Sequence, residues 1–317
     1  MNRSTIAPNN EQHWLELRTR DLTSTEISAL FGLSPYLTEF ELYHRKVAGE
    51  VVRLTPSERM VWGTRLEASI AAGAAEDRGW KVQPRKGYTR IDDLRIGSSF
   101  DFEIEAVDAR GAGLLEVKNV DGAAFARNWI EHADGSIEAP AHIELQLQHQ
   151  LYVADLAWGA IAVLVGGNTL HVLERARDHQ VASAIRAKAA AFWAQVDAGA
   201  PPQPNYERDA EFILQHLRAN ANEGEVVQAD TDLEVLLTAY RSVSDQLNEL
   251  EQSKEELKAR VLDRVGTASK IVANVGTVTC GVVKDSPGKL ITPDLVGTYV
   301  GARKGYRQFR FNVRKEK

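Results

Sequence analysis

Apolar and polar positions follow helical spacing in some segments of the chain and strand spacing in others. Helical spacing predicts helices at about 38–47, 56–79, 140–155 and 178–198. Strand-like runs predict strands at 80–90, around Asp101 and Glu116, at 158–165 and at 169–175. Residues 119–139 read as a long polar loop. A capping box of Thr23 and Glu26, closed by Gly32, predicts a further helix near the N-terminus.

The clearest boundary in the chain is the proline-rich segment 201–204, which predicts domains at 1–205 and 206–317. Beyond it, apolar residues spaced alternately by three and four predict a heptad-like helix at about 232–265. This helix is interpreted either as a coiled-coil seam or as one arm of an intramolecular helical hairpin. A small β unit is predicted at about 270–317, with a basic patch that includes Arg303, Lys304 and Arg307.

Composition changes this picture mainly by exclusion. The 317 residues carry a net charge of −6, so any contact with nucleic acid must come from a local basic surface. The single cysteine, Cys280, excludes a disulfide framework and any metal site built on several cysteines. No segment has the apolar run of a signal peptide or a membrane helix, so we expect no membrane association and a cytoplasmic location.

The segment 97–118 carries the candidate chemistry. Glu116 and Lys118 are two residues apart on a predicted strand, so both side chains point to one face, where Asp101 from the neighbouring strand meets them. Two carboxylates and a lysine suit Mg²⁺-assisted phosphodiester hydrolysis. Glu67 is a candidate third acid on the 56–79 helix. The alternative is an amphipathic strand with a charged outer face and a surface Glu67 paired with a nearby arginine.

A second candidate site lies at the start of the helix predicted after Thr23. Helix N-termini offer free N–H groups and a positive dipole end, so Arg18, Ser24 and Thr25 are candidates for binding phosphate. The alternative is an ordinary helix cap with solvated arginines.

Three glutamines and a histidine stand close together in the 140–155 helix. Gln146 and Gln150 share one face, and Gln148 shares another with Tyr152. These side chains are interpreted as contacts to a DNA backbone or to an active-site water. His149 is interpreted as structural.

Five segments in this order resemble the YqaJ-type viral recombinase family and, more distantly, lambda-type alkaline exonucleases of the PD-(D/E)xK superfamily. They are LRTRDLTSTEISALFGLSPY, WGTRLE, SSFDFEI, LLEVK and LQLQHQLYV. The resemblance covers about residues 13–200. It implies an α/β, restriction-endonuclease-like core with a mixed central sheet flanked by helices, followed by a C-terminal helical and β appendage at 206–317.

The resemblance also implies an active site. Asp101 and Glu116 match the metal-binding carboxylates, Lys118 matches the catalytic lysine, and Glu67 matches the helical acid. With the Val117 carbonyl, these acids would hold Mg²⁺, and Mn²⁺ is expected to substitute. Further matches assign Gln146 to the active site, Gln148 and Tyr152 to a Q-x-x-x-Y pattern, and Arg18, with Thr25 at the adjoining helix start, to the pocket for the DNA 5′-phosphate.

The function implied is Mg²⁺-dependent 5′→3′ digestion of double-stranded DNA ends, leaving 3′ single strands for a phage-type annealing protein. A ring-shaped homotrimer and a phage or prophage origin in a bacterial cell are implied as well. The usual Pro-Asp-Gly is Phe100-Asp101-Phe102 here, which changes the turn and keeps the ligand. The alternatives are a structure-specific or nicking endonuclease of the same fold, and a non-catalytic DNA-binding partner of a recombinase.

Overall fold

The computed structural model describes residues 2–49, 51, 53, 55–106, 108–216, 226–285 and 310–313. The chain divides into two compact units, Met1–Ala221 and Asn222–Lys317. The predicted domain boundary at 205 stays a prediction.

A five-stranded mixed sheet forms the centre of the first unit, with strand order β11-β10-β7-β6-β3. Its strands are β3 (Val82–Pro84), β6 (Phe102–Ile104), β7 (Gly113–Val120), β10 (Trp158–Val165) and β11 (Thr169–Ala176). The pair β7 and β10 is parallel, whereas the other neighbours are antiparallel. Parallel neighbours cannot be joined by a tight turn and need a crossover connection. The crossover from β7 to β10 contains the helix α5 (Ala141–Ala154).

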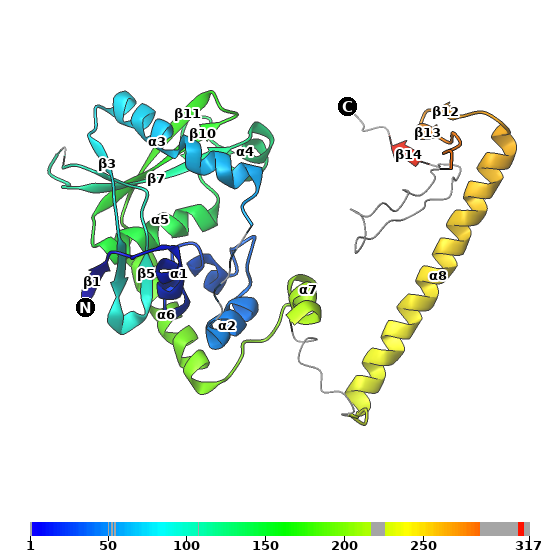
Figure 1. Cartoon of the computed structure of the whole chain (residues 1–317), viewed down its shortest axis with the longest axis horizontal. Coiled ribbons are helices and arrows are strands. Elements are labelled where there is room, and N and C mark those ends of the chain that lie inside the picture. The colour runs from blue at the N-terminus through cyan, green and yellow to red at the C-terminus, as the bar shows by residue number, and fades with distance from the viewer. Residues whose placement is uncertain are drawn as a thin grey trace, which may run out of the picture. The chain divides into compact units, whose positions relative to one another are not determined.

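Helices cover both faces of this sheet (Figure 1). The helix α3 (Glu58–Arg78) packs on one face, and α5 with α6 (His179–Ala198) lies on the other. Alternate residues of the strands divide between the two cores: Leu115 and Val117 belong to the α3 core, whereas Leu114 belongs to the α5 core. The mixed sheet flanked by helices that the sequence predicted is therefore confirmed.

The predicted helices begin and end at capping residues. Thr38 caps α2 (Glu39–Ala48) by accepting from the Glu41 N–H at 3.1 Å. Asp178 caps α6 by accepting from the N–H groups of Gln180 and Val181. Ser57 caps α3, and Gly79 ends it with a left-handed φ of 66°.

A second sheet, with strand order β1-β4-β5-β2, lies next to the N-terminal helix α1 (Glu11–Arg20). Its strands are β1 (Arg3–Ile6), β2 (Leu22–Thr23), β4 (Tyr88–Ile91) and β5 (Ile96–Ser98), with the short 3₁₀ helix η2 (Asp92–Leu94) between β4 and β5. The single strand predicted at 80–90 was wrong, because the segment bends near Gly87 (φ 98°) and supplies β3 to one sheet and β4 to the other.

The loop predicted at 119–139 is partly ordered. After β7 it forms the helix α4 (Gly122–Asn128) and a hairpin of β8 (Ile130–Glu131) and β9 (Ile137–Glu138). After the proline-rich segment, α7 (Tyr206–His216) packs on α2. Thr38 and Asp209 form a hydrogen bond between these two helices.

The second unit contains the 35-residue helix α8 (Thr231–Val265), and none of its residues is buried. The predicted heptad-like helix is therefore confirmed as one unbroken helix, and the described part of this unit holds no second helix to pair with it. A three-stranded sheet joins β12 (Lys270–Ala273), β13 (Gly276–Thr279) and β14 (Arg310–Val313). The predicted basic patch at Arg303, Lys304 and Arg307 lies outside the described residues.

None of the helices in the described ranges combines the length and the apolar character needed to cross a membrane.

Candidate active site and the adjoining groove

The hairpin of β6 and β7 brings the two predicted carboxylates together. Phe102 pairs with Leu115, so Asp101 and Glu116 stand next to each other just beyond the end of this ladder. At this point the Val117 N–H donates to the Asp101 side chain, at 2.9 Å. The Phe-Asp-Phe sequence therefore still delivers the aspartate to Glu116.

Glu116 is almost fully buried, with 3% of its surface exposed, and three side chains donate to it. Lys118 and Gln146 both donate to Oε1. Gln150 donates to Oε2 at 2.7 Å, and Lys118 also donates to the Gln146 Oε1 at 3.2 Å. Because Glu116 and Lys118 lie on the α5 face of β7, two turns of α5 line the site opposite them.

The electrostatics of the site reflect acids crowded in a poorly solvated place. Burial and then the neighbouring Glu116 raise the pKa of Asp101 to about 8, against the Val117 N–H and Lys118. Burial and then Glu116 also raise the pKa of Glu67, which places the α3 acid within electrostatic reach of the site. Burial acts to lower the pKa of Lys118, but Glu116 and Asp101 raise it above its ordinary value.

The donor set fits a divalent cation in chemistry and in charge. Carboxylate oxygens are the ligands that Mg²⁺ prefers, and the mutual repulsion among Asp101, Glu116 and Glu67 is what such a cation would relieve. Within the described ranges, however, no group of three or more His, Cys, Asp or Glu side chains is already arranged to hold a metal ion. The Val117 carbonyl stays a predicted ligand.

Gln148 and Tyr152 do not join the cluster. The Gln148 side chain donates to the Ala176 carbonyl at 2.9 Å and accepts from the Asp178 N–H at 2.8 Å, which ties α5 to the β11–α6 connection. Tyr152 is buried, and burial raises its pKa against nearby arginines that include Arg186. Both residues lie on a different face of α5 from Gln146 and Gln150, because an α-helix turns through about 200° in the two residues that offset the pairs.

A groove of about 1290 Å³ runs beside α1, α2 and α3 and carries the predicted phosphate-binding pair. Arg18 donates to the Thr25 hydroxyl at 3.3 Å and stacks over the Trp14 ring at 4.6 Å. Further cationic side chains line the same groove: Arg45, Lys46, Arg53 and Arg65. With Arg18 these are five cations against two acids in the lining, Glu11 and Glu26, so the groove carries a net positive charge on an acidic protein, as contact with a polyanion requires.

The helix end expected at Thr23–Thr25 takes a different form. Residues Ile27–Phe31 form a 3₁₀ helix, η1, of five residues, which is too short to offer the dipole of an α-helix. One of the two hydrogen bonds of the predicted capping box is present, because Glu26 accepts from the Thr23 N–H at 2.9 Å. Ser24 is buried and contacts Ser98 at 3.1 Å, so it does not line the groove. The Arg18 and Thr25 side chains therefore stay the predicted phosphate-binding pair, without the helix end that was expected beside them.

A hydrogen bond couples the groove to the turn that precedes the β6–β7 hairpin. The Trp14 indole N–H donates to the Ser99 hydroxyl at 2.9 Å, two residues before Asp101. Just before Ser99, Gly97 of β5 leaves room for the Tyr88 side chain of β4, because a Cβ at that position would stand 2.3 Å from the Tyr88 hydroxyl. Helix α1 and the Asp101 turn are thus fixed to each other.

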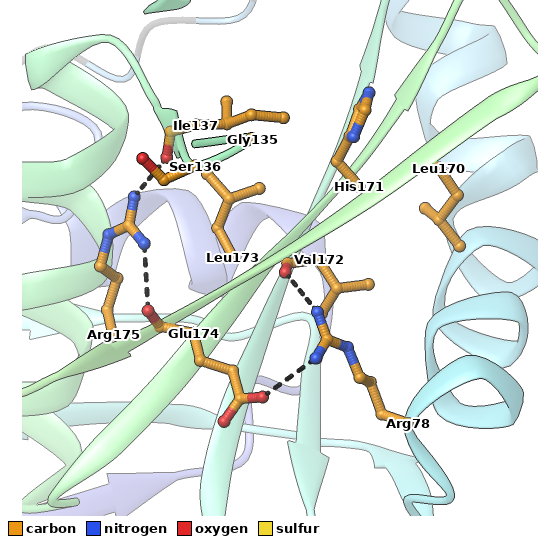
Figure 2. Close-up of a pocket in the computed structure, with 10 residues that line it drawn as sticks. All are labelled: Arg78, Gly135, Ser136, Ile137, Leu170, His171, Val172, Leu173, Glu174 and Arg175. Carbon is orange, nitrogen blue, oxygen red and sulfur yellow. Dashed lines mark hydrogen bonds and ion pairs between the residues drawn. The ribbon is translucent and has the colours of Figure 1, made fainter. Parts of the chain in front are cut away.

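A separate crevice of about 400 Å³ lies along β11 (Figure 2). Arg78 donates to the Val172 carbonyl at 2.9 Å and pairs with Glu174 at 3.5 Å. Arg175 donates to the Ile137 carbonyl at 3.0 Å and pairs with Glu144. These arginines bind strand carbonyls and carboxylates of the protein itself, so we assign no chemistry to this crevice.

Two residues of the site were not among those that the resemblance assigned to the active site. Gln150, which the i, i+4 spacing placed on one face with Gln146, contacts Glu116 directly. Tyr36 lines the groove, and its ring meets the His142 ring of α5. No local pattern marks Tyr36, because its place in the groove comes from tertiary packing.

Residues 13–157 match the family model described as the YqaJ-like viral recombinase domain. This match confirms the resemblance drawn from the motifs, and the mixed α/β sheet flanked by helices agrees with the fold that the resemblance implied. A curated relative, "Uncharacterized protein YqaJ" of Bacillus subtilis (strain 168), is 25% identical over 265 residues, covering 81% of this chain and 79% of that protein.

Solved structures similar to this chain include the alkaline exonuclease LHK-Exo from Laribacter hongkongensis, with a TM-score of 0.47 and 14% identity over 66% of this chain and 100% of that one. LHK-Exo in complex with dAMP gives a TM-score of 0.45 and 15% identity over the same shares, 66% and 100%. A phage related exonuclease from Haemophilus somnus 129PT gives 0.41 and 11% identity, over 56% of this chain and 94% of that chain.

Proposed function

We propose that this protein is a Mg²⁺-dependent exonuclease that digests double-stranded DNA from its 5′ ends. The product would be a 3′ single-stranded tail for recombination by strand annealing. The observation that carries the proposal is the meeting of Asp101, Glu116, Lys118 and Gln146 beside a groove lined by Arg18 and other cations. Acids and a lysine at one place supply hydrolysis, and the basic groove supplies a place for the strand.

The residues of the cluster divide into two roles. Asp101 and Glu116, with Glu67 and the Val117 carbonyl, would hold Mg²⁺, for which Mn²⁺ would substitute. When bound, the cation would polarise the scissile phosphate and make a water molecule more acidic. Lys118 would orient the attacking water and stabilise negative charge that develops on the phosphate. Gln146 and Gln150 hold the Glu116 carboxylate in position through N–H donors.

Polarity would come from the groove. Arg18 and the Thr25 hydroxyl, which are already in contact, would receive the terminal 5′-phosphate through charge-assisted hydrogen bonds. A substrate that lacks this phosphate loses the contact and its directional anchor.

The decisive experiment is digestion of end-labelled linear duplex DNA, either 5′-phosphorylated or 5′-hydroxyl, with Mg²⁺ or with EDTA. We expect degradation with Mg²⁺ and none with EDTA, with the 5′-phosphorylated substrate digested faster. A circular duplex separates the main alternative. A nicking or structure-specific endonuclease cuts the circle, whereas an end-dependent exonuclease leaves it intact. A non-catalytic DNA-binding protein degrades neither substrate.

The same proposal extends to partners and setting. The tail would be taken up by a phage-type single-strand annealing protein, and the nuclease would act as a closed homo-oligomer, with a ring trimer as the form to test. Its setting would be the cytoplasm of a bacterial cell that carries a phage or prophage. Co-purification with an annealing protein and the mass of the nuclease in solution test the first two points.

A further inference from the structure

The groove contains two aromatic side chains, and they differ in how far they are engaged. Trp14 is half-buried, with its N–H bound to Ser99 and its ring under Arg18. Tyr36 has 83% of its surface exposed, and its ring meets the His142 ring edge-on with 5.9 Å between the centroids. Most of the Tyr36 side chain therefore remains available for contact with a molecule bound in the groove.

The loop that carries Tyr36 is held from below. The Ser34 hydroxyl is buried and accepts from the N–H groups of Tyr36 at 3.3 Å and Leu37 at 3.1 Å. Arg208 of α7 donates to the Ser34 carbonyl at 2.6 Å. Thr38, at the end of the loop, is bonded to Asp209 of the same helix. Fixed backbone on both sides of an exposed ring lowers the entropy that a bound partner must remove.

Contacts of Tyr36 link the two phosphate positions of the proposed reaction. It lines the groove together with Arg18 and Thr25, and its ring meets His142, which lies one turn of α5 before Gln146, the partner of Lys118. One nucleotide links a terminal 5′-phosphate to the first scissile phosphate. If these phosphates sit at Arg18 and at Lys118, the sugar and base of that nucleotide lie in the part of the groove where Tyr36 stands.

We propose that Tyr36 stacks on the base of the 5′-terminal nucleotide and so forms a nucleobase subsite between the phosphate anchor and the catalytic cluster. This inference rests on the proposed function. Every base has a π-face, so such a subsite accepts all four bases, as a nuclease without sequence preference requires. Stacking also requires the terminal base to leave its partner, so the subsite favours duplex ends whose first base pair is open.

The test uses a 5′-phosphorylated DNA duplex with an unpaired 2-aminopurine at its 5′ end, bound by the full-length protein in EDTA so that no cleavage is needed. Stacking quenches 2-aminopurine fluorescence. We expect strong quenching with the wild type and with Tyr36→Phe, and little quenching with Tyr36→Ala at saturating protein. Affinity of the alanine variant should fall about tenfold, which corresponds to about 1.4 kcal/mol.

The matched control is Tyr206→Ala, because Tyr206 is also exposed, at 72%, and does not line the groove. It should bind and quench as the wild type does. The inference is overturned if saturating wild-type protein leaves the probe bright, or if Tyr36→Ala quenches it equally. Circular dichroism and thermal unfolding check that each variant is folded.

These outcomes are separable from the proposed function. Wild-type protein that digests duplex ends without quenching the probe keeps the function and loses the subsite. Wild-type protein that quenches the probe in a Tyr36-dependent manner but degrades no DNA with Mg²⁺ keeps the nucleobase subsite and loses the exonuclease.

Discussion

Two helices of this protein reverse the usual relation between polarity and burial. In α5, the polar residues Gln148, His149 and Gln150 are buried, with exposed fractions of 8%, 0% and 3%. In α8, apolar residues such as Leu247 and Leu250 are exposed, at 56% and 67%. Buried amides are retained where every donor and acceptor has a use, whereas an exposed apolar stripe contributes little to the stability of the helix that carries it.

The contrast teaches that amphipathic pattern alone does not locate function. The heptad spacing of α8 was a strong signal in the sequence, yet within this chain none of its side chains is buried. The glutamines of α5 gave a weaker signal, yet Gln146 and Gln150 contact Glu116. The two helices differ because α5 is the crossover between parallel strands and is enclosed by the fold.

The largest effect should come from the lysine that α5 faces. Lys118→Ala removes the ammonium that donates to Glu116 and Gln146. We expect nuclease activity to fall about 10²- to 10⁴-fold, as for the loss of a catalytic acid–base or charge-stabilising group. Single-turnover digestion of linear duplex with Mg²⁺ measures this effect. Wild-type rates in the variant would remove the catalytic assignment of the whole cluster.

A matched pair within α5 sharpens the comparison next. Gln150→Met keeps the length of the side chain but cannot donate to Glu116, so we expect activity to fall about tenfold or more. Gln148→Met breaks the tie to Ala176 and Asp178, so it should cost about 1–3 kcal/mol of unfolding free energy and leave activity per folded molecule unchanged. Denaturant unfolding and nuclease kinetics, measured on both variants, test these expectations. Loss of activity in Gln148→Met together with wild-type activity in Gln150→Met would contradict the geometry.

His149 gives α5 a distinct pH signature. Burial lowers its pKa to about 4, against the opposing charge of Glu26. An unfolded histidine titrates near 6.5. Since the unfolded state binds more protons between these values, this contribution to stability is present above pH 6.5 and is lost as the pH falls toward 4. We expect about 2 kcal/mol less stability from this group at pH 4.5 than at pH 7.

Urea unfolding at the two pH values checks this expectation. In His149→Gln the difference between pH 7 and pH 4.5 should shrink by about that amount, whatever the substitution does to stability at pH 7. An unchanged difference would mean that protonation of His149 is not linked to unfolding.

The smallest effect should be on α8. Leu247→Ala and Leu250→Ala remove exposed side chains, so we expect each to change the unfolding free energy by less than about 0.5 kcal/mol at low protein concentration. Thermal unfolding over a range of concentrations measures this effect. A loss of several kcal/mol would show that the stripe is covered in solution.

Much of the fold was predictable from local signals. The caps at Thr38, Ser57 and Asp178 and the run at 158–165 placed their elements closely. The strand predicted at 80–90 failed because a turn inside it sends its halves to different sheets, and single-sequence periodicity does not encode sheet membership. The helix after Thr23 failed in type, since a capping box marks the start of a helix without fixing its length or its kind.

The part of the candidate site that follows from the alternation of side chains along a strand was predictable. The i, i+2 spacing placed Glu116 and Lys118 on one face, and the neighbouring strand supplied Asp101. It was harder to predict which face of α5 meets β7. The sequence alone does not show whether Gln148 or Gln150 points toward Glu116, because that depends on how the helix is rotated about its axis in the fold. Tyr36 and Ser99 entered through loops held by distant partners, Arg208 and Trp14, and no sequence spacing records such contacts.

The parallel pairing of β7 with β10 also has a consequence for the order in which the protein folds during synthesis. Glu116 emerges from the ribosome well before Gln150 and before Trp158–Val165, the strand that must dock beside it. Non-local pairing of this kind forms slowly compared with hairpins and helices. A nascent chain that ends before residue 158 therefore lacks a strand that borders the candidate site, so the growing polypeptide completes this site only after the crossover has closed.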